Sequence, residues 1–265
     1  MRVMGRLLLF FSFCFGAFDR QPLLPLQIAG GTVFQSLGTT GNFFSDPASL
    51  LKVGGIVSVI TSKPFRIVSL SDRSFMVSYP SAYGNLGFSV QTSGLSIYRE
   101  TTVAVAAARR FGESLNAGLR LSVHQIDIKN YGAQTVLSLS GSLFYPLSET
   151  VSWSLLGFNL NGPRLGQSQE PLPQILATGF RYLPAGPLQA LIEIEKDLAH
   201  RPRQKFGVVW ETTSWLTLAT GYANNPDQAS FGFSLQLSQI TVDYAIASHL
   251  HLPETHTLAI HFRLP

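Results

Sequence analysis

Apolar and polar residues alternate one by one along most of the chain from Gly54 to the C-terminus. In residues 228–238, QASFGFSLQLS, alanine, phenylalanine and leucine share one face, while serine, glycine and glutamine share the other. Residues 119–123, LRLSV, repeat the pattern. Successive side chains of a β-strand point to opposite faces, so this period of two predicts strands with one apolar and one polar face.

The alternation divides the chain into fourteen predicted strands. Many reach about 9–11 residues, the length that a tilted membrane strand needs, whereas a soluble strand has about 5–6. The segments are 54–61, 73–79, 84–92, 99–110, 115–128, 133–145, 150–160, 172–182, 187–196, 203–211, 214–222, 228–237, 239–247 and 255–264.

The links between these segments also alternate. Short links at 146–149, 183–186, 212–213 and 238 are followed by mostly longer ones at 161–171, 197–202, 223–227 and 248–254. Short periplasmic turns that alternate with longer outer loops are typical of outer-membrane barrels. Aromatic residues at or near segment ends fit the girdles of such barrels: Tyr79, Tyr98, Tyr131, Tyr145, Tyr182, Tyr222 and Trp215.

We therefore predict an all-β fold, a transmembrane up-and-down antiparallel β-barrel of about 14 strands (12–14). The range reflects residues 54–79, which could hide another strand or a loop in the lumen. A soluble β-sandwich or barrel is the alternative, since it too shows alternation. Strand length, low charge and an export signal oppose that alternative.

Composition supports a membrane setting. Charged residues make up 13% of the chain, about half of the usual ~25%, and the mean hydropathy is +0.20. No apolar run of about 18 residues follows the N-terminus, so the sequence does not predict a transmembrane helix there.

The first residues resemble a secretory signal peptide. Arg2 and Arg6 form a basic start, residues 7–18 form a short apolar run, and Cys14 and Gly16 are small residues compatible with cleavage near Ala17. An N-terminal anchor helix is the alternative. Cys14 is the chain's one cysteine and would leave with the signal, so no disulfide or thiolate metal site is expected.

A short helical turn is predicted before the first strand. In SDPASLL, Asp46 can cap the turn, Pro47 suits its first position, and Ala48 continues it. We expect this piece to plug the periplasmic mouth of the barrel, with Leu50 and Leu51 against the inner wall. The predicted organisation is a signal peptide at 1–17, a plug at 18–52 and a barrel at 53–265.

Several motifs make the chain resemble the PorV/PorQ family of outer-membrane barrels, which is similar to the FadL long-chain fatty-acid transporters. They are DPASLL (46–51), GLSIYRETTVAVAAARRFG (94–112), IKNYGAQ (128–134), LLGFNLNGP (155–163), LPQILATGFRYLP (172–184) and VDYAIASHLHLPETHTLAIHF (242–262). Asp46 stands where the family usually has asparagine. The resemblance implies a FadL-like barrel and a role in transport or in type IX secretion.

Enzyme motifs are not found: the chain has no Gly-x-Ser-x-Gly elbow, phosphate loop or His-Glu-x-x-His. His249, His251 and His256 could offer imidazoles to a metal, but an exposed loop is the simpler interpretation. His124, an inward serine and Asp243 could mimic a hydrolase triad, which a serine-rich lumen also supplies by chance. We predict no enzyme, no cofactor and no metal.

Charged residues opposite the apolar faces are predicted to point into the lumen. They are Arg120, His124, Arg181, Glu211, Asp243, His261 and Arg263. Charges inside a barrel must be paired or hydrated. We favour a network that props the barrel over a constriction that selects solutes. The candidate binding residues are thus the plug turn Asp46, Pro47 and Ala48 together with Arg120, His124, Arg181, Glu211 and Asp243.

Two functions follow as hypotheses. The first is passage of small or hydrophobic molecules across the bacterial outer membrane. The second is an accessory envelope barrel that binds exported proteins of a type IX-like secretion system, through loops 161–171 and 248–254. Expected partners are outer-membrane lipid and lipopolysaccharide, the outer-membrane assembly machinery and possible secretion proteins. The net charge of +4 is scattered along the chain, so we expect no nucleic-acid partner.

Overall fold

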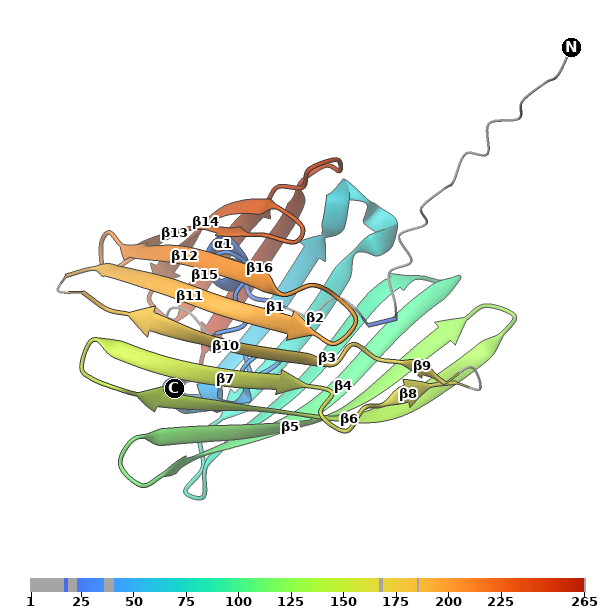
Figure 1. Ribbon diagram of the computed structural model, residues 1–265, viewed down its shortest axis with the longest axis horizontal. Coiled ribbons are helices and arrows are strands. Elements are labelled where there is room, and N and C mark those ends of the chain that lie inside the picture. Colours follow the sequence, from blue (N-terminus) through green and yellow to red (C-terminus); the bar gives the residue numbers. More distant parts are fainter. Residues whose placement is uncertain (1–16, 19–22, 36–40, 167–168, 185, 265) are drawn as a thin grey trace, which may run out of the picture.

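The described strands close into one barrel of fourteen antiparallel strands (Figure 1). The computed structural model describes residues 17–18, 23–35, 41–166, 169–184 and 186–264. Each barrel strand pairs with the next barrel strand along the chain, and the first pairs with the last from Ile56↔Arg263 to Lys63↔His256. The predicted up-and-down barrel is confirmed.

The strand bounds lie close to the predicted segments. The barrel strands are β1 (Ile56–Lys63), β2 (Asp72–Tyr79), β3 (Asn85–Leu95), β4 (Tyr98–Phe111), β5 (Leu115–Ile128), β6 (Gly132–Pro146), β7 (Val151–Phe158), β10 (Ile175–Tyr182), β11 (Leu188–Asp197), β12 (Arg203–Glu211), β13 (Leu216–Ala223), β14 (Gln228–Leu237), β15 (Ile240–Ala247) and β16 (Thr255–Arg263). A small hairpin of β8 (Arg164–Leu165) and β9 (Glu170–Pro171) stands outside the barrel sheet.

The alternation places apolar side chains on the outer face and small or polar ones inside. On β16, Leu258 and Ile260 are 39% and 49% exposed, whereas His261 is 1% exposed. A protein that folds in water shows the reverse pattern, because its apolar face is buried. An apolar outer face is what a barrel surrounded by lipid requires.

The two ends of the barrel differ in their links. We call the end where β1 begins and β16 ends the terminal end, and the opposite end the loop end. Links at the terminal end are short throughout, as predicted. At the loop end, 159–174 and 248–254 are long, but 96–97 and 129–131 are short, contrary to the simple alternation. Residues 64–71 hold two 3-10 turns, η2 (Pro64–Arg66) and η3 (Val68–Leu70), and no additional strand.

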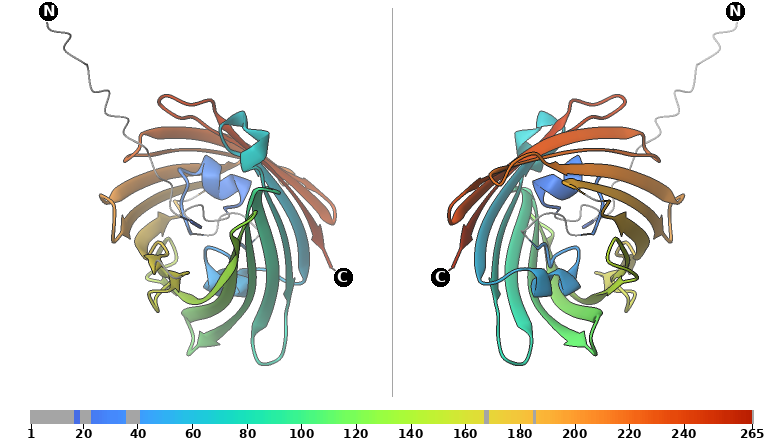
Figure 2. Two further views of the ribbon diagram at one scale, coloured as in Figure 1. Left: turned by 90° about the vertical axis from the view of Figure 1, so that its right-hand side faces the viewer. Right: turned by 90° about the vertical axis from the view of Figure 1, so that its left-hand side faces the viewer.

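The N-terminal segment lies inside the barrel (Figure 2). It contains a short helix, α1 (Pro25–Ala29), and the predicted turn, which is the 3-10 helix η1 (Pro47–Lys52). Asp46 occupies the N-cap position, but its side chain makes no capping hydrogen bond, contrary to prediction. Residues 1–16 of the predicted signal peptide lie outside the described residues. None of the described helices has the length and apolar character to cross a membrane.

Candidate functional site: the plugged lumen

Two parts of the N-terminal segment fill different regions of the lumen. We call residues 23–35 and 41–53 the plug. The part with α1 packs against β13–β16, and the part with η1 packs against β3–β6. The sequence predicted a plug at one mouth of the barrel, but the plug reaches further. It runs from the loop end, where β14 begins and β15 ends, to the terminal end near the β4–β5 turn.

Two apolar clusters join the plug to the wall. The cluster around α1 contains Leu26, Ile28, Ala29, Val33, Leu191, Val209, Ala219, Ala245 and Ala247. The cluster around η1 contains Leu24, Phe43, Phe44, Leu50, Ile60, Met76, Ala106, Ala108 and Ala259, with Leu51 packed against it as predicted. Alanine predominates on the wall side of both clusters, because larger side chains would leave no space for the plug.

Glycines on the inner face let the plug approach the wall closely. A Cβ on Gly207 would lie 2.2 Å from the carbonyl oxygen of Gly30, and one on Gly221 would lie 2.1 Å from the nitrogen of Gly31. These two wall glycines are directly opposite each other on β12 and β13. A Cβ on Gly118 would likewise lie 2.3 Å from the nitrogen of Ala48. The wall is thus shaped to the plug backbone at both of its parts.

Glu193 on β11 holds the α1 part of the plug through main-chain N–H groups. Phe34 donates to its Oε1 at 2.9 Å, and Gln35 donates to its Oε2 at 3.2 Å. The side chain is 0% exposed. A buried carboxylate that accepts main-chain N–H groups forms hydrogen bonds roughly twice as strong as neutral ones, so Glu193 anchors this turn of the plug.

Lys205 on β12 completes the same anchor. Its Nζ lies 3.1 Å from Glu193 and 2.7 Å from Glu195, and it donates to the carbonyl oxygen of Thr32 at 2.8 Å. The ammonium also lies 3.7 Å from the centre of the Phe34 ring. We call Glu193, Glu195 and Lys205 the charged anchor. Charges of both signs meet on the wall, and Glu193 and Lys205 each also form hydrogen bonds with the plug.

Asp46 links the η1 part to β6. Ser142 donates its hydroxyl to Asp46 Oδ1 at 2.7 Å and accepts the N–H of Ala48 at 2.8 Å. Asn85 on β3 adds a bond to the carbonyl oxygen of Leu50 at 2.6 Å. The predicted plug turn Asp46, Pro47 and Ala48 therefore contacts the wall, and Pro47 lies against the Cα of Gly118.

Lys52 and Arg181 bring two positive charges to the same ring. They lie 4.1 Å and 5.3 Å from the centre of the Phe144 ring on β6. Lys52 belongs to the plug, and burial lowers its pKa to about 8. The charge of Arg181 contributes to this lowering, while Asp46 opposes it. The ammonium of Lys52 is thus costly at this position.

Gln27 ties the two parts of the plug together. Its Nε2 donates to the carbonyl oxygen of Phe34 at 2.7 Å and to the hydroxyl of Ser45 at 2.9 Å. Its Oε1 accepts from Asn42 Nδ2 at 2.7 Å. Because one buried amide bonds residues on both sides of the link 36–40, the two parts form one hydrogen-bonded body.

Arg120 and His124 form a polar stripe on β5, as their alternation predicts. Arg120 is 2% exposed, donates to Ser140 at 3.1 Å and lies between the rings of Phe44 and Phe158, at 5.9 Å and 5.7 Å. His124 contacts the hydroxyls of Thr102 and Ser138 at 2.9 Å and 2.7 Å. The stripe joins neighbouring strands.

Asp243 belongs to a second polar cluster, on the seam where the barrel closes. His261 lies 2.7 Å from Ser58 Oγ through Nδ1 and 3.2 Å from Asp243 Oδ2 through Nε2. The possible trio of His124 with Asp243 is not assembled, because the two residues belong to separate clusters. Ser58, His261 and Asp243 form a different trio, in which the serine contacts Nδ1 of the histidine. All three residues are at most 3% exposed.

The remaining predicted residues lie away from the plug. Glu211 has the inward register but is exposed at the end of β12, where Gln189 donates to it at 2.9 Å. Arg263 is exposed at the end of β16. His249 bonds Thr255 at 2.9 Å, and His256 bonds Tyr244 at 2.6 Å. Within the described ranges, no group of three or more His, Cys, Asp or Glu side chains is arranged to hold a metal.

Sequence reasoning missed the charged anchor. The alternation in IEIEKDL already places Glu193 and Glu195 on the polar face of β11, and Lys205 on that of β12. The signal was therefore present. What the sequence lacks is the information that Phe34 and Gln35, more than 150 residues earlier, donate to Glu193.

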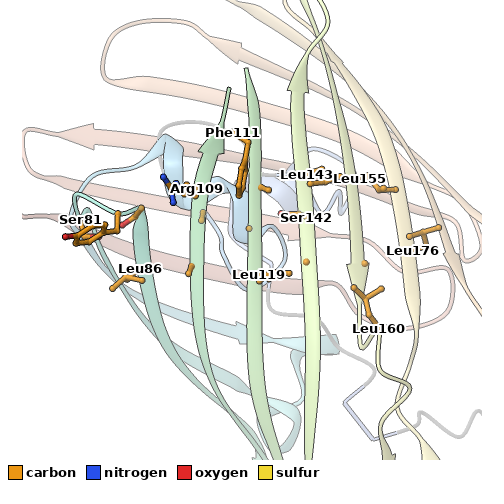
Figure 3. A pocket seen from close by; sticks show the side chains of 18 residues that line it. Ser81, Leu86, Arg109, Phe111, Leu119, Ser142, Leu143, Leu155, Leu160 and Leu176 are labelled. Atoms are coloured by element: carbon orange, nitrogen blue, oxygen red, sulfur yellow. The ribbon is translucent and has the colours of Figure 1, made fainter. Parts of the chain in front are cut away.

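A groove of about 770 Å³ lies on the outer face, over β3–β7 and β10 (Figure 3). Its sides include Leu86, Phe111, Leu119, Leu155 and Leu176. Ala107, Ala117, Gly141 and Gly157 form the floor of the groove between these larger side chains. The groove is nearly all apolar, which suits contact with lipid chains. On the inner side of the same wall, Gly118 contacts the plug.

These features define a closed antiparallel barrel with an apolar outer face and a lumen filled by its own N-terminal segment. The toluene transporter TbuX of Ralstonia pickettii shares this fold, with a TM-score of 0.67 and 11% identity, over 94% of this chain and 100% of that one. The monoaromatic hydrocarbon channel CymD matches with a TM-score of 0.62 and 12% identity, over 91% and 97% of the two chains.

The toluene transporter TodX of Pseudomonas putida matches with a TM-score of 0.61 and 12% identity, over 92% of this chain and 97% of that one. No family model matches the chain, and no curated protein matches its sequence. Identities this low show a common fold. Membership of the PorV/PorQ family stays a prediction.

Proposed function

We propose that this protein lets small hydrophobic molecules pass across the bacterial outer membrane, through a lumen that the plug closes. The observation that carries the proposal is the plug itself. A segment that only stabilised a barrel could pack through apolar clusters alone, whereas this one is also held by a charged anchor and by hydroxyl and amide contacts. Such contacts can exchange with water when the plug moves.

The fold gives independent support. TbuX, CymD and TodX are a toluene transporter, a monoaromatic hydrocarbon channel and a toluene transporter, and this chain shares their barrel. The inner face offers a mixed surface to a moving molecule, because phenylalanine rings lie beside serine hydroxyls. Phe158 of the wall and Phe44 of the plug flank Arg120, with Ser140 next to them.

We place the terminal end at the periplasm in this proposal. Short turns mark the periplasmic side of outer-membrane barrels, and the terminal end has the short turns. The plug then runs from the outer side, with α1, to the periplasmic side, with η1. The accessory role in type IX-like secretion stays a prediction from the sequence resemblance.

Reconstituted liposomes test the proposal. Vesicles that contain the protein are loaded with a reporter for an aromatic hydrocarbon, and influx of toluene is compared with influx of a sugar of similar size. We expect faster toluene influx than in protein-free vesicles, beyond its passive permeation, and little change for the sugar. Equal influx of both solutes with and without protein would contradict the proposed passage.

A further inference from the structure

Glu100 on β4 is a partly buried carboxylate with no charged side-chain partner. It accepts from the Tyr98 hydroxyl at 2.7 Å and from the main-chain N–H of Phe18 at 3.2 Å. Among the residues that the structure describes, no lysine, arginine or histidine forms an ion pair with Glu100. Two neutral donors leave the charge of this group unbalanced, which is costly away from water.

Phe18 is firmly seated at the same place. Its side chain is 6% exposed, and its ring centre lies 4.8 Å from that of His124. It shares an apolar cluster with Ile126 on β5 and with Leu165 and Leu172 at the loop end. The chain near residue 18 is thus held by a ring contact and by a hydrogen bond to a carboxylate.

The sequence places a processing site at this point. Small residues at Cys14, Gly16 and Ala17 lie at the end of a short apolar run that follows a basic start, the pattern that a signal peptidase recognises. Hydrolysis adds water across one peptide bond, leaving a carboxylate on the released peptide and a new α-amine on the retained chain. An α-amine with a pKa of about 7.7–8.0 takes up a proton near neutral pH.

We propose that export processing creates an amino terminus at Ala17 or Phe18 and that Glu100 binds this α-ammonium. With a terminus at Phe18 the ammonium is the nitrogen that already lies 3.2 Å from Glu100, and with a terminus at Ala17 it lies one residue, about 3.8 Å, further along the chain. Cleavage supplies the positive charge that Glu100 lacks, and the neutral N–H contact becomes part of an ion pair. The processed terminus is then a charged anchor for the segment that leads into the plug.

The burial of Phe18 also sets the order of events. A peptidase needs an exposed, extended bond, whereas this residue is enclosed by the barrel. Processing must therefore precede packing of Phe18 against His124. This inference does not depend on which molecules pass through the barrel, so its tests are separate from the influx assay.

The first test determines the start of the mature chain. Protein purified from outer membranes is examined by intact-mass measurement and N-terminal sequencing. We expect a chain that begins at Ala17 or Phe18. A chain that keeps its first residues, or one that starts beyond Phe18, would overturn the proposal.

The second test measures the reactivity of the new amine. The folded protein is acylated near pH 7, and modification is quantified on the N-terminal peptide that ends at Arg20. We expect the wild-type amine to react about fivefold more slowly than that of Glu100→Gln, as for an ion pair worth about 1 kcal/mol. Glu113→Gln, an exposed change at the other end of β4, is the matched control and should react like wild type.

A comparison within the wild type avoids any effect of substitution on folding. The pH midpoint of acylation is measured for the folded chain and for the denatured chain. An ion pair with Glu100 should raise the midpoint in the folded chain. Equal midpoints, or equal rates in wild type and Glu100→Gln, would show that the carboxylate does not bind the amino terminus.

Discussion

At the scale of single residues, buried charges on the wall hold the plug by its main chain. Glu193 accepts from Phe34 and Gln35, and Lys205 donates to Thr32. Main-chain partners depend little on the plug's side chains. Glu193 and Lys205 therefore hold the plug by its backbone, in addition to the two apolar clusters.

Glu193→Gln should loosen the α1 part of the plug. The substitution keeps size but removes the charge, so the two N–H groups lose charge-assisted bonds, at a cost of about 2 kcal/mol. Hydrogen exchange at residues 24–35 measures this local opening. Glu211→Gln, at an exposed rim position, is the control and should change exchange by less than about 0.5 kcal/mol. Unchanged exchange in Glu193→Gln would contradict the anchor.

Lys52 should make the η1 part sensitive to pH. Its pKa is lowered from 10.5 to about 8 in the docked plug, so the undocked chain binds more protons between these values. Docking of the η1 part therefore becomes more stable as pH rises from about 8 to 10.5. The stability gained in this way is lost again as pH falls back through this range to about 8.

Comparison with Lys52→Met isolates this effect. At pH 7 the methionine variant should protect residues 43–53 from hydrogen exchange better than wild type, because the half-buried charge is gone. The difference between the two proteins should shrink as the pH rises across the window and vanish above it. A constant difference at all pH values would mean that titration of Lys52 is not its source.

At the scale of elements, one stretch of wall serves two surfaces. Gly118 on β5 faces the plug, while Gly141 on β6 faces outward beside Leu119 in the groove. A strand carries side chains on both faces, so small residues at adjacent positions thin the wall locally. η1 thus lies directly behind the groove in this part of the barrel.

A pair of alanine substitutions separates the two surfaces. Gly118→Ala would bring a Cβ to 2.3 Å from Ala48 N, so η1 must shift, and protease cleavage within residues 41–53 should increase severalfold. Gly141→Ala meets only Leu119 Cδ2 at 3.1 Å and the Gly118 carbonyl at 3.3 Å. That variant should resist protease like wild type. Similar cleavage in both variants would contradict face-specific packing.

At the scale of the whole molecule, the barrel wall and the plug have side chains of complementary size. The barrel encloses a lumen lined by alanine, glycine and serine, and the plug supplies the phenylalanine and leucine side chains that fill it. The loop end is also tied across the seam, where Arg66 pairs with Glu254 and Phe65 packs against His249. If the barrel opens as proposed, the tied seam favours movement of the plug within a fixed wall.

Deletion of residues 20–50 should raise single-channel conductance in planar bilayers. The deletion removes the first part of the plug and all but residues 51–53 of the second, and it leaves the barrel strands intact. Heat-dependent mobility on gels verifies that the shortened chain still folds, and Glu193→Gln provides a milder case that should open more often than wild type. Conductance equal to that of wild type in a folded deletion variant would remove the plug as the barrier.

The sequence by itself determined the barrel strands and their faces, because alternation is a local property of consecutive residues. The same parity placed Arg120, His124, Arg181 and Asp243 on the inner face. The tertiary structure decided which of them meet: Asp243 joins His261, while His124 joins Thr102 and Ser138. It also set Asp46 against Ser142 instead of its own helix. The contacts of Asp243 and His124 depend on the register in which neighbouring strands pair. The contact of Asp46 with Ser142 depends on the path of the plug through the lumen. Neither the register nor the path has a local period in the sequence.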